Sequence, residues 1–150
     1  MPELTKLVTT VNLDDRHLER LRNEFPDVEF VVCPERERLA EYLHDAQAYV
    51  GSGLIPAYLE QFPHLKWAQS PGAGVDSYLF PELIESDIIV TNNSGVHAPN
   101  IAEHVLGMML AFARGFPEMV LNQQKRVWEG PTRETFELGY QTLAVVGLGD

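Results

Sequence analysis

Two glycine-rich turns and one loop histidine have the residue types and spacing that could do chemistry. The turn Gly72-Ala73-Gly74-Val75 leaves backbone N–H groups unshielded, so it can hold a carboxylate without a cationic side chain. Gly147-Leu148-Gly149 follows the apolar segment 142–146. A strand running into G-x-G allows a tight turn and a close backbone approach to a pyrophosphate. His97 precedes a long apolar segment and is a candidate for contacting substrate.

Each of these features also has a purely structural interpretation. The first turn could simply join a strand to a helix, with Asp76 as the helix N-cap. The G-x-G could be a plain strand end, and a loop histidine is often only solvated. Gly51-Ser52-Gly53 and Asn92-Asn93-Ser94-Gly95 are two further turns of the same kind.

No metal site is expected from this sequence. Cys33 is the only cysteine, and no set of His, Asp and Glu residues has ligand spacing. A single cysteine also excludes a disulfide framework, which favours a reducing, cytoplasmic compartment. We expect Cys33 to be a small apolar residue at the end of a strand, and His104 beside Glu103 to be structural.

Composition narrows the class of protein. The chain has 150 residues, 22 acidic against 11 basic, and a formal net charge of −11. Such a surface repels phosphate backbones and anionic lipid, which argues against nucleic-acid or membrane-surface binding. The 45% hydrophobic content is enough for a folded core. The longest uncharged apolar run, residues 105–113, is far shorter than the roughly 20 residues that cross a bilayer.

Short apolar runs alternate with helical patterns over the first 90 or so residues. We expect strands at residues 7–11, 28–32, 48–50, 65–69 and 88–91, and helices after Asp14, after Pro34, at 56–62 and near 77–84. This alternation predicts an α/β fold with a doubly wound parallel sheet. Ligands bind beyond the carboxyl ends of the strands in such sheets, so the three glycine and asparagine turns should lie at one edge.

The pattern changes near residue 98. Asn100 and Glu103 have the N-cap and N3 spacing of a capping box. The helix that they would begin is apolar on two faces, so we expect it to pack between two domains or two subunits. Residues 142–146 should form a buried strand. Because a domain does not end on such a turn, we expect the chain to be the amino-terminal part of a longer protein.

In these marks the sequence resembles the D-isomer-specific 2-hydroxyacid dehydrogenase family, which includes glyoxylate/hydroxypyruvate reductases, phosphoglycerate dehydrogenases and formate dehydrogenases. The motifs that carry the resemblance are Gly72-Ala73-Gly74-Val75-Asp76, Ile89-Val90-Thr91-Asn92, Ala102-Glu103-His104-Val105, Ala113-Arg114 and Val145-Val146-Gly147-Leu148-Gly149. Each motif is short, and their order and spacing make the match specific. The match to any one subfamily is not specific.

The resemblance implies a flavodoxin-like substrate domain at residues 1–97, followed at 98–150 by the start of a Rossmann domain inserted into it. It implies that Ala73, Gly74 and Val75 help to hold the substrate carboxylate, with Ser52 and Gly53 lining the same cleft. It places Asn100 and Glu103 near the nicotinamide, and NAD or NADP on the turn at Gly147, Leu148 and Gly149. The family's arginine and its histidine–glutamate pair fall beyond residue 150, so no catalytic residue is assigned.

The predicted function is therefore hydride transfer between a nicotinamide and a small 2-oxo or 2-hydroxy acid, in a homodimer. The alternative is a non-catalytic relative that senses a dinucleotide and binds a protein partner. A phospho-acceptor receiver domain is excluded, because it needs an Asp after the third strand and a Lys after the fifth. This chain has Gly51 and Asn92 at those places.

Overall fold

The computed structural model describes residues 4–54 and 56–147. The chain divides into two compact units, one ending at Ser94 and the other beginning at Gly95.

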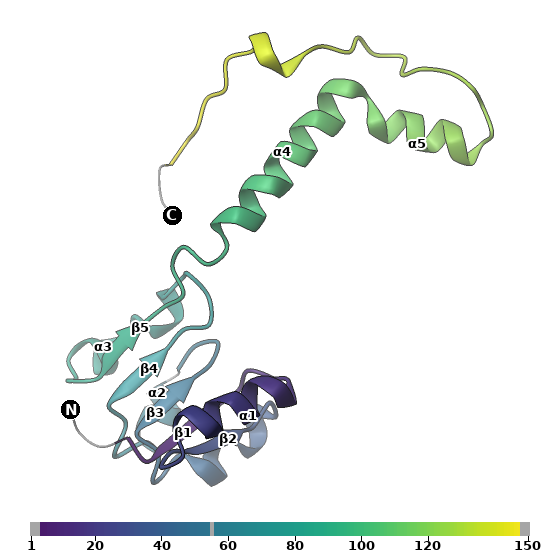
Figure 1. The fold of residues 1–150 in the computed structure, drawn as a ribbon. Helices are drawn as coiled ribbons and strands as arrows, with labels where there is room; N and C mark the ends of the chain where they lie inside the picture. Colours follow the sequence, from purple (N-terminus) through teal and green to yellow (C-terminus); the bar gives the residue numbers. More distant parts are fainter. Residues whose placement is uncertain (1–3, 55, 148–150) are drawn as a thin grey trace. The chain divides into compact units, whose positions relative to one another are not determined.

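The first unit is built on a five-stranded parallel sheet with the strand order β2-β1-β3-β4-β5 (Figure 1). The strands are β1 (Lys6–Thr9), β2 (Glu29–Val32), β3 (Ala48–Val50), β4 (Trp67–Gln69) and β5 (Ile89–Thr91). The chain steps first to one side of β1 and then to the other, which is the flavodoxin-like doubly wound order. The predicted α/β fold class is confirmed, with strands slightly shorter than expected.

One row of side chains, with one residue from each strand, crosses the whole sheet and forms the sheet side of the hydrophobic core. The paired residues along this row are Val31, Val8, Tyr49, Ala68 and Val90. Side chains from the connecting segments close over it and are buried: Leu39, Leu43, Leu54, Phe62, Tyr78 and Leu83. This core therefore lies on one face of the sheet.

The connections between the strands are short. They contain α1 (Asp15–Glu24), the 3₁₀ helix η1 (Arg36–Tyr42), α2 (Pro56–Leu59), the 3₁₀ helix η2 (Asp76–Tyr78) and α3 (Pro81–Ile84). Asp14 is the N-cap of α1, and its Oδ1 accepts a hydrogen bond from Arg16 N at 2.9 Å. The helix expected after Asp14 is thus confirmed, with Asp14 as its N-cap.

Three of these predictions need correction. The helix expected after Pro34 is 3₁₀ and begins at Arg36, with no side-chain cap to start an α-helix earlier. The segment near 77–84 is η2 and α3 rather than one helix. The N-cap position before η2 is Val75, so Asp76 lies inside the first turn instead of capping it.

The opposite face of the sheet is only partly covered. Leu7 and Thr9 of β1 are buried there, beneath α1, whereas Ile89 of β5 is 64% exposed. A cavity of about 320 Å³ opens on this face between Leu21 of α1 and Trp67 of β4. Parallel sheets are normally covered on both faces. Within the described residues of the first unit, no helix covers the β3–β5 side of this face.

The second unit contains α4 (Ala98–Arg114), α5 (Phe116–Gln124) and the 3₁₀ helix η3 (Leu138–Tyr140). Gly115 ends α4 and precedes α5 with a left-handed φ of 70°. A Cβ at this glycine would lie 2.6 Å from Pro131 Cβ. The left-handed backbone and the close proline both require glycine at this turn.

The chain after α5 folds back on α4. Phe136 N donates to Ala113 O at 3.1 Å, the Phe112 and Phe136 rings pack edge to face, and the Arg133 guanidinium lies 4.1 Å from the Phe112 ring centre. These contacts bury Ala113.

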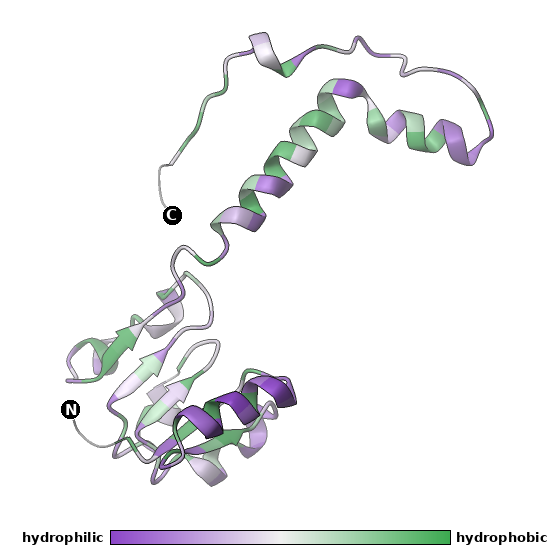
Figure 2. Cartoon of the chain, in the orientation of Figure 1, coloured by the Kyte–Doolittle hydropathy of each residue, from purple (hydrophilic) through white to green (hydrophobic). Residues whose placement is uncertain are grey.

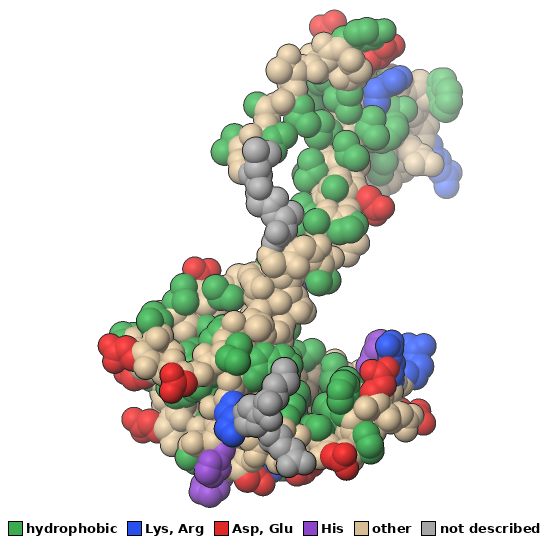
Figure 3. Space-filling model, turned by 60° about the vertical axis from the view of Figure 1, so that its left-hand side comes forward, with side chains coloured by type: hydrophobic (Ala, Val, Ile, Leu, Met, Phe, Trp, Pro, Cys, Tyr) green, Lys and Arg blue, Asp and Glu red, His purple; other side chains and the backbone are tan. Residues whose placement is uncertain are grey.

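Most of α4 remains apolar and exposed. Figure 2 shows hydrophobic residues along much of its length, and Figure 3 shows apolar side chains gathered over the helices of this unit. The large exposed side chains of α4 are Ile101, Val105, Leu106, Met108, Leu110 and Phe112. The expectation of two apolar faces agrees with these exposures.

The predicted strand at 142–146 is not formed. Residues 142–147 are exposed and carry no strand assignment, and Val146 is fully exposed. A strand exists only through hydrogen bonds to a neighbouring strand. The described part of the chain supplies no such neighbour for this segment.

Candidate functional site

Three turns follow adjacent strands at the carboxyl edge of the sheet, as the sequence predicts. They are residues 51–53 after β3, 71–75 after β4 and 92–95 after β5. Hydrogen bonds extend the strand pairing up to the turns: Gly51 N donates to Gln69 O at 3.2 Å and Ser70 N to Thr91 O at 2.8 Å. Asn93 N of the third turn donates to Gly72 O of the second at 3.0 Å. The three turns therefore form one continuous surface.

The carbonyl groups of the turn at 71–75 are all held by the surrounding protein. Pro71 O accepts from Asn93 Nδ2 at 3.1 Å, Gly72 O from Asn93 N at 3.0 Å, Ala73 O from Asn92 Nδ2 at 2.7 Å, Gly74 O from Ser70 Oγ at 3.0 Å, and Val75 O from Tyr78 N at 2.8 Å. The side chains of Asn92, Asn93 and Ser70 thus hold three of these carbonyls, and backbone N–H groups hold the other two.

Only some N–H groups of the same turn have partners: Gly72 N donates to Ser70 Oγ at 3.3 Å, whereas the next three are free. Those of Ala73, Gly74 and Val75 donate no hydrogen bond to any described residue. Ala73 and Gly74 are exposed, and Val75 is half-buried. Three successive free N–H groups beside fully engaged carbonyls give this turn a positive partial charge, which is suited to an oxyanion or a carboxylate.

The turn after β3 is arranged in the same way. Its carbonyls accept from three side chains: Tyr78 Oη to Gly51 O, Arg36 Nη2 to Ser52 O at 2.7 Å, and Tyr49 Oη to Gly53 O at 3.1 Å. Neither the N–H nor the hydroxyl of Ser52 has a hydrogen-bond partner among the described residues. Ser52 is exposed and can offer both donors to a ligand.

Close packing ties this turn to its neighbour. Gly53 has a left-handed φ of 90°, and a Cβ there would lie 3.0 Å from Ser77 Cβ. Tyr78 Oη also donates to Gln69 O at 3.2 Å, so one hydroxyl bridges the end of β4 and the turn after β3. The two turns are therefore held in register by Tyr78.

The electrostatics of this edge favour neutral tyrosines. Burial raises the pKa of Tyr78 to about 12 and also raises the pKa of Tyr49. Both hydroxyls therefore act as hydrogen-bond donors at neutral pH. One opposing charge is present: Asp76 Oδ2 lies 3.7 Å from the position of a Cβ on Gly74. An anion bound at this turn must gain more from the N–H groups than it loses to this carboxylate.

The remaining predicted residues belong to the second unit. His97 is the N-cap residue of α4 and makes no side-chain capping bond, although its carbonyl accepts from Ile101 N at 3.0 Å. The helix begins at Ala98 rather than Asn100, because Pro99 is well suited to a first helical turn. Asn100 and Glu103 are therefore exposed residues within the helix and do not form a capping box.

Gly147 is the first residue of the predicted G-x-G turn. It has a left-handed φ of 97°, and a Cβ added there would have no atom within 4 Å. Leu148 and Gly149 lie outside the described residues. Neither a cluster of three or more metal-ligating side chains nor a helix long and apolar enough to cross a bilayer occurs in residues 4–54 and 56–147.

Cys33 matches its structural interpretation. It is buried at the end of β2, and its thiol donates to Glu35 O at 3.3 Å. Burial raises the pKa of the Cys33 thiol, which disfavours the nucleophilic thiolate.

Residues 6–145 match the family model for the catalytic domain of D-isomer specific 2-hydroxyacid dehydrogenases. The chain belongs to this family. It is 30% identical over 149 residues to a D-3-phosphoglycerate dehydrogenase of Methanocaldococcus jannaschii, a match that covers 97% of this chain and 28% of the relative. It is 32% identical over 92 residues to a hydroxypyruvate reductase of Thermotoga maritima, covering 61% of this chain and 30% of the relative.

Solved structures give the same result. A D-isomer specific 2-hydroxyacid dehydrogenase family protein from Aeromonas salmonicida has a TM-score of 0.70 at 25% identity, covering 88% of this chain and 43% of that one. A D-lactate dehydrogenase from Aquifex aeolicus, complexed with NAD and lactic acid, has a TM-score of 0.72 at 17% identity and supports the fold. It is matched over 85% of this chain and 39% of its own length. The chain therefore spans less than half of the relatives described here.

Sequence reasoning found the turns but missed the side chains that hold them. Asn92 and Asn93 were visible only as a turn signal after β5, and their contacts with the preceding turn depend on the strand order. Arg36 and Tyr78 gave no signal at all. Both come from separate connecting segments, and only the folded sheet brings them to residues 51–53.

Proposed function

We propose that the chain is the amino-terminal part of an NAD(P)-dependent oxidoreductase that transfers a hydride between a nicotinamide and a small D-2-hydroxy acid or its 2-oxo acid. The observation that carries this proposal is the turn at 71–75, with five engaged carbonyls and three free N–H groups at Ala73, Gly74 and Val75. Family membership names the reaction class, and this turn supplies a site for the carboxylate that all such substrates share.

In this proposal each residue of the edge has a separate task. The N–H groups of Ala73, Gly74 and Val75 bind the substrate carboxylate, and Ser52 and Gly53 line the same cleft. His97 contributes from the loop before α4. Binding the carboxylate through fixed backbone dipoles needs no rearrangement when substrate arrives, which is how preorganised sites lower a barrier.

The proposed domain division is a substrate-binding domain at residues 1–97 and the start of a Rossmann domain at 98–150. Support for an inserted Rossmann domain comes from the partly covered face of the sheet. Trp67 is half-buried and Ile89 is exposed beside the 320 Å³ cavity, so this face has room for a helix that returns from later in a longer chain.

The proposed cofactor is NAD or NADP, which supplies the hydride donor or acceptor when bound. Gly147 fits the first glycine of a phosphate-binding turn, because its left-handed backbone and empty Cβ position leave room for a close approach. Leu148 and Gly149 would continue this turn, with Asn100 and Glu103 of α4 near the nicotinamide. The arginine and the histidine–glutamate pair of the family pattern are expected after residue 150.

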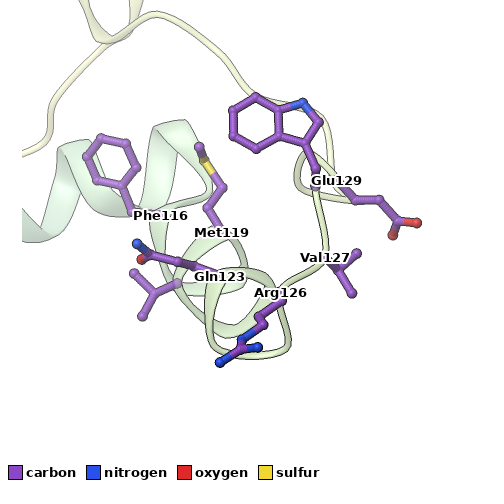
Figure 4. Close-up of a pocket in the computed structure, with 8 residues that line it drawn as sticks. Phe116, Met119, Gln123, Arg126, Val127 and Glu129 are labelled. Atoms are coloured by element: carbon purple, nitrogen blue, oxygen red, sulfur yellow. The ribbon is translucent and has the colours of Figure 1, made fainter.

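We also propose that the complete protein is a cytoplasmic homodimer. The support is the exposed apolar surface of the second unit, which includes α4 and a cavity of about 520 Å³ beside α5. Figure 4 shows this cavity and the residues that line it: Phe116, Met119, Val120, Gln123, Arg126, Val127, Trp128 and Glu129. Trp128 is fully exposed. Exposed apolar surface of this kind marks interfaces. Light scattering that shows a monomer of the complete protein at micromolar concentration would contradict this proposal.

The test of the proposed function is a turnover assay of the complete protein. Oxidation of NADH or NADPH is followed with glyoxylate, pyruvate and hydroxypyruvate, and the reverse reaction with the D and L isomers of lactate. We expect turnover that is specific for the D isomer. Tight binding of a dinucleotide without turnover of any 2-oxo acid would instead favour the alternative, a non-catalytic sensor that binds a protein partner.

A further inference from the structure

A series of side-chain hydrogen bonds runs along the partly covered face of the sheet and ends at the turn after β4. Trp67 Nε1 donates to Thr91 Oγ1 at 2.7 Å, and Thr91 Oγ1 donates to Gln69 Oε1. Gln69 Nε2 donates to Asn93 Oδ1 at 2.7 Å, and Asn93 Nδ2 donates to Pro71 O at 3.1 Å. Strands β4 and β5 are thereby connected to a carbonyl of the turn.

The first member of the series fixes the direction of every bond in it. An indole N–H can only donate a hydrogen bond, so the Thr91 hydroxyl accepts from Trp67 and has its own hydrogen free for Gln69. The Gln69 amide therefore turns its oxygen to Thr91 and its NH₂ group to Asn93. The Asn93 amide is ordered in the same way, with its NH₂ group on Pro71 O. Bonds that all point one way polarise and strengthen one another.

Gln69 is the central member, and all of its amide groups are used. Its Oε1 accepts from Thr91, and its Nε2 donates both to Asn93 Oδ1 and, at 2.9 Å, to Ser70 O. The side chain is half-buried at the end of β4. It lines the 320 Å³ cavity of this face together with Pro71 and Asn93. Hydrogen bonds, rather than close packing on every side, therefore hold it in place.

Asn93 connects Gln69 with the free N–H groups of the 71–75 turn. Its side chain holds Pro71 O, and its backbone N–H donates to Gly72 O at 3.0 Å. Gly72 O belongs to the peptide group that carries the N–H of Ala73, the first of the three free donors. A shift of Asn93 therefore changes the direction of this donor.

We propose that Gln69 is a positioning residue for the carboxylate site. It acts through Asn93 and keeps the Ala73 N–H directed at the substrate carboxylate, and the same hydrogen bonds couple Trp67 to ligand binding. The inference rests on the proposed function, because it assigns Gln69 to the turn that binds a 2-oxo acid in that proposal. A donor that is oriented before the substrate arrives lowers the cost of binding.

The first experiment follows Trp67 in the complete wild-type protein. The protein is labelled with ¹⁵N, and the indole N–H signal of Trp67 is identified by its loss in Trp67→Phe. The wild type is titrated with glyoxylate and, separately, with sodium chloride at the same ionic strength. We expect the indole signal to shift with glyoxylate, to saturate at the same concentration as the Ala73 amide, and to stay unchanged with salt. An indole signal that glyoxylate leaves unchanged, in protein that turns glyoxylate over, would overturn the coupling.

The second experiment measures KM and kcat for glyoxylate in variants of the complete protein. Gln69→Leu keeps a side chain of similar size and removes its three hydrogen bonds. Asn93→Ala removes the next member of the series, and the double variant tests whether the two residues act together. Gln61→Leu is the matched control, because Gln61 is exposed and its Nε2 also donates to a carbonyl, Ala57 O at 3.0 Å.

We expect Gln69→Leu to raise KM about 2- to 10-fold, which corresponds to the loss of one neutral hydrogen bond. The value of kcat should change much less, because the lost contact serves binding. The double variant should have the same KM as Asn93→Ala alone, since both changes interrupt the same series. The Trp67 indole shift should disappear in Gln69→Leu, and Gln61→Leu should behave as the wild type does.

Two results with the variants would overturn the inference. A wild-type KM in Gln69→Leu means that the turn keeps its orientation without this side chain. Effects on KM that multiply in the double variant mean that Gln69 does not act through Asn93. In either case wild-type turnover of glyoxylate would still support the proposed function. Absence of wild-type turnover with every 2-oxo acid would reject the proposed function, and the inference with it.

Discussion

Replacing Asn92 by aspartate is expected to weaken carboxylate binding much more than it weakens the fold. Asn92 Nδ2 donates to Ala73 O at 2.7 Å. Aspartate has nearly the same shape, but it places a carboxylate oxygen against this carbonyl and removes the donor. The peptide group that joins Ala73 to Gly74 then loses the hydrogen bond that fixes its orientation. The Gly74 N–H belongs to this peptide group, so its direction is no longer fixed.

The sizes of the changes in unfolding free energy and in carboxylate binding depend on how exposed the affected groups are. Asn92 and Ala73 are exposed, so water can solvate the released carbonyl, and the cost in unfolding free energy should be about 0.5–1.5 kcal/mol. A hydrogen bond to a charged carboxylate contributes about 1.5–3 kcal/mol. Misdirecting one N–H group should therefore raise the dissociation constant about 10- to 100-fold, and the added negative charge should raise it further.

Two measurements separate these effects. Urea unfolding gives the change in stability, and KM against kcat for the smallest 2-oxo acid, glyoxylate, gives the change in binding. We expect KM to rise much more than kcat falls. Asn23→Asp makes the same charge change on the exposed surface of α1 and should change neither quantity appreciably. If Asn92→Asp left KM at the wild-type value while the protein stayed folded, the role assigned to this turn would be wrong.

Two other substitutions test the packing beneath the site. Gly51→Ala would place a Cβ 2.1 Å from Tyr49 Oη, so we expect the free energy of unfolding in urea to fall by about 1–3 kcal/mol. Gly139→Ala has open space at its Cβ position and should change this free energy by no more than about 0.5 kcal/mol. Equal effects of the two substitutions would refute the crowding at Gly51. For Tyr78, the folded pKa of about 12 lies above the ordinary value of 10.0, so its stabilising contribution is complete below pH 10 and is lost as the pH rises to 12. That loss, about 3 kcal/mol, should be seen in denaturant unfolding of the wild type and be absent from Tyr78→Phe; parallel pH curves for the two proteins would contradict the assignment.

Much of the first unit could be predicted because its signals are local. Five apolar runs separated by turn residues require an α/β sheet, and Asp14 sits where a helix N-cap must be. The position of the three glycine and asparagine turns followed from one rule about parallel strands. No long-range contact had to be known for any of these predictions.

The predictions that failed depended on partners that a pattern does not reveal. Residues 142–146 have the composition of a buried strand, but a strand needs a neighbour. Asn100 and Glu103 have capping-box spacing, but Pro99 lets the helix begin earlier at Ala98. The hydrogen bonds that Asn92 and Asn93 donate to the 71–75 turn could not be predicted either. These two residues are about 20 residues away in sequence and become neighbours of the turn only through the pairing of β4 with β5.

The central claim is that free N–H groups of the 71–75 turn bind the carboxylate of a 2-oxo acid. Titration of the ¹⁵N-labelled protein with glyoxylate, followed by amide chemical shifts, tests this claim directly, with sodium chloride at the same ionic strength as the control. We predict saturable shifts that are largest for the amides of Ala73, Gly74 and Val75 and absent in the salt control. Unchanged amides at these three positions, under conditions where glyoxylate is turned over, would contradict the claim.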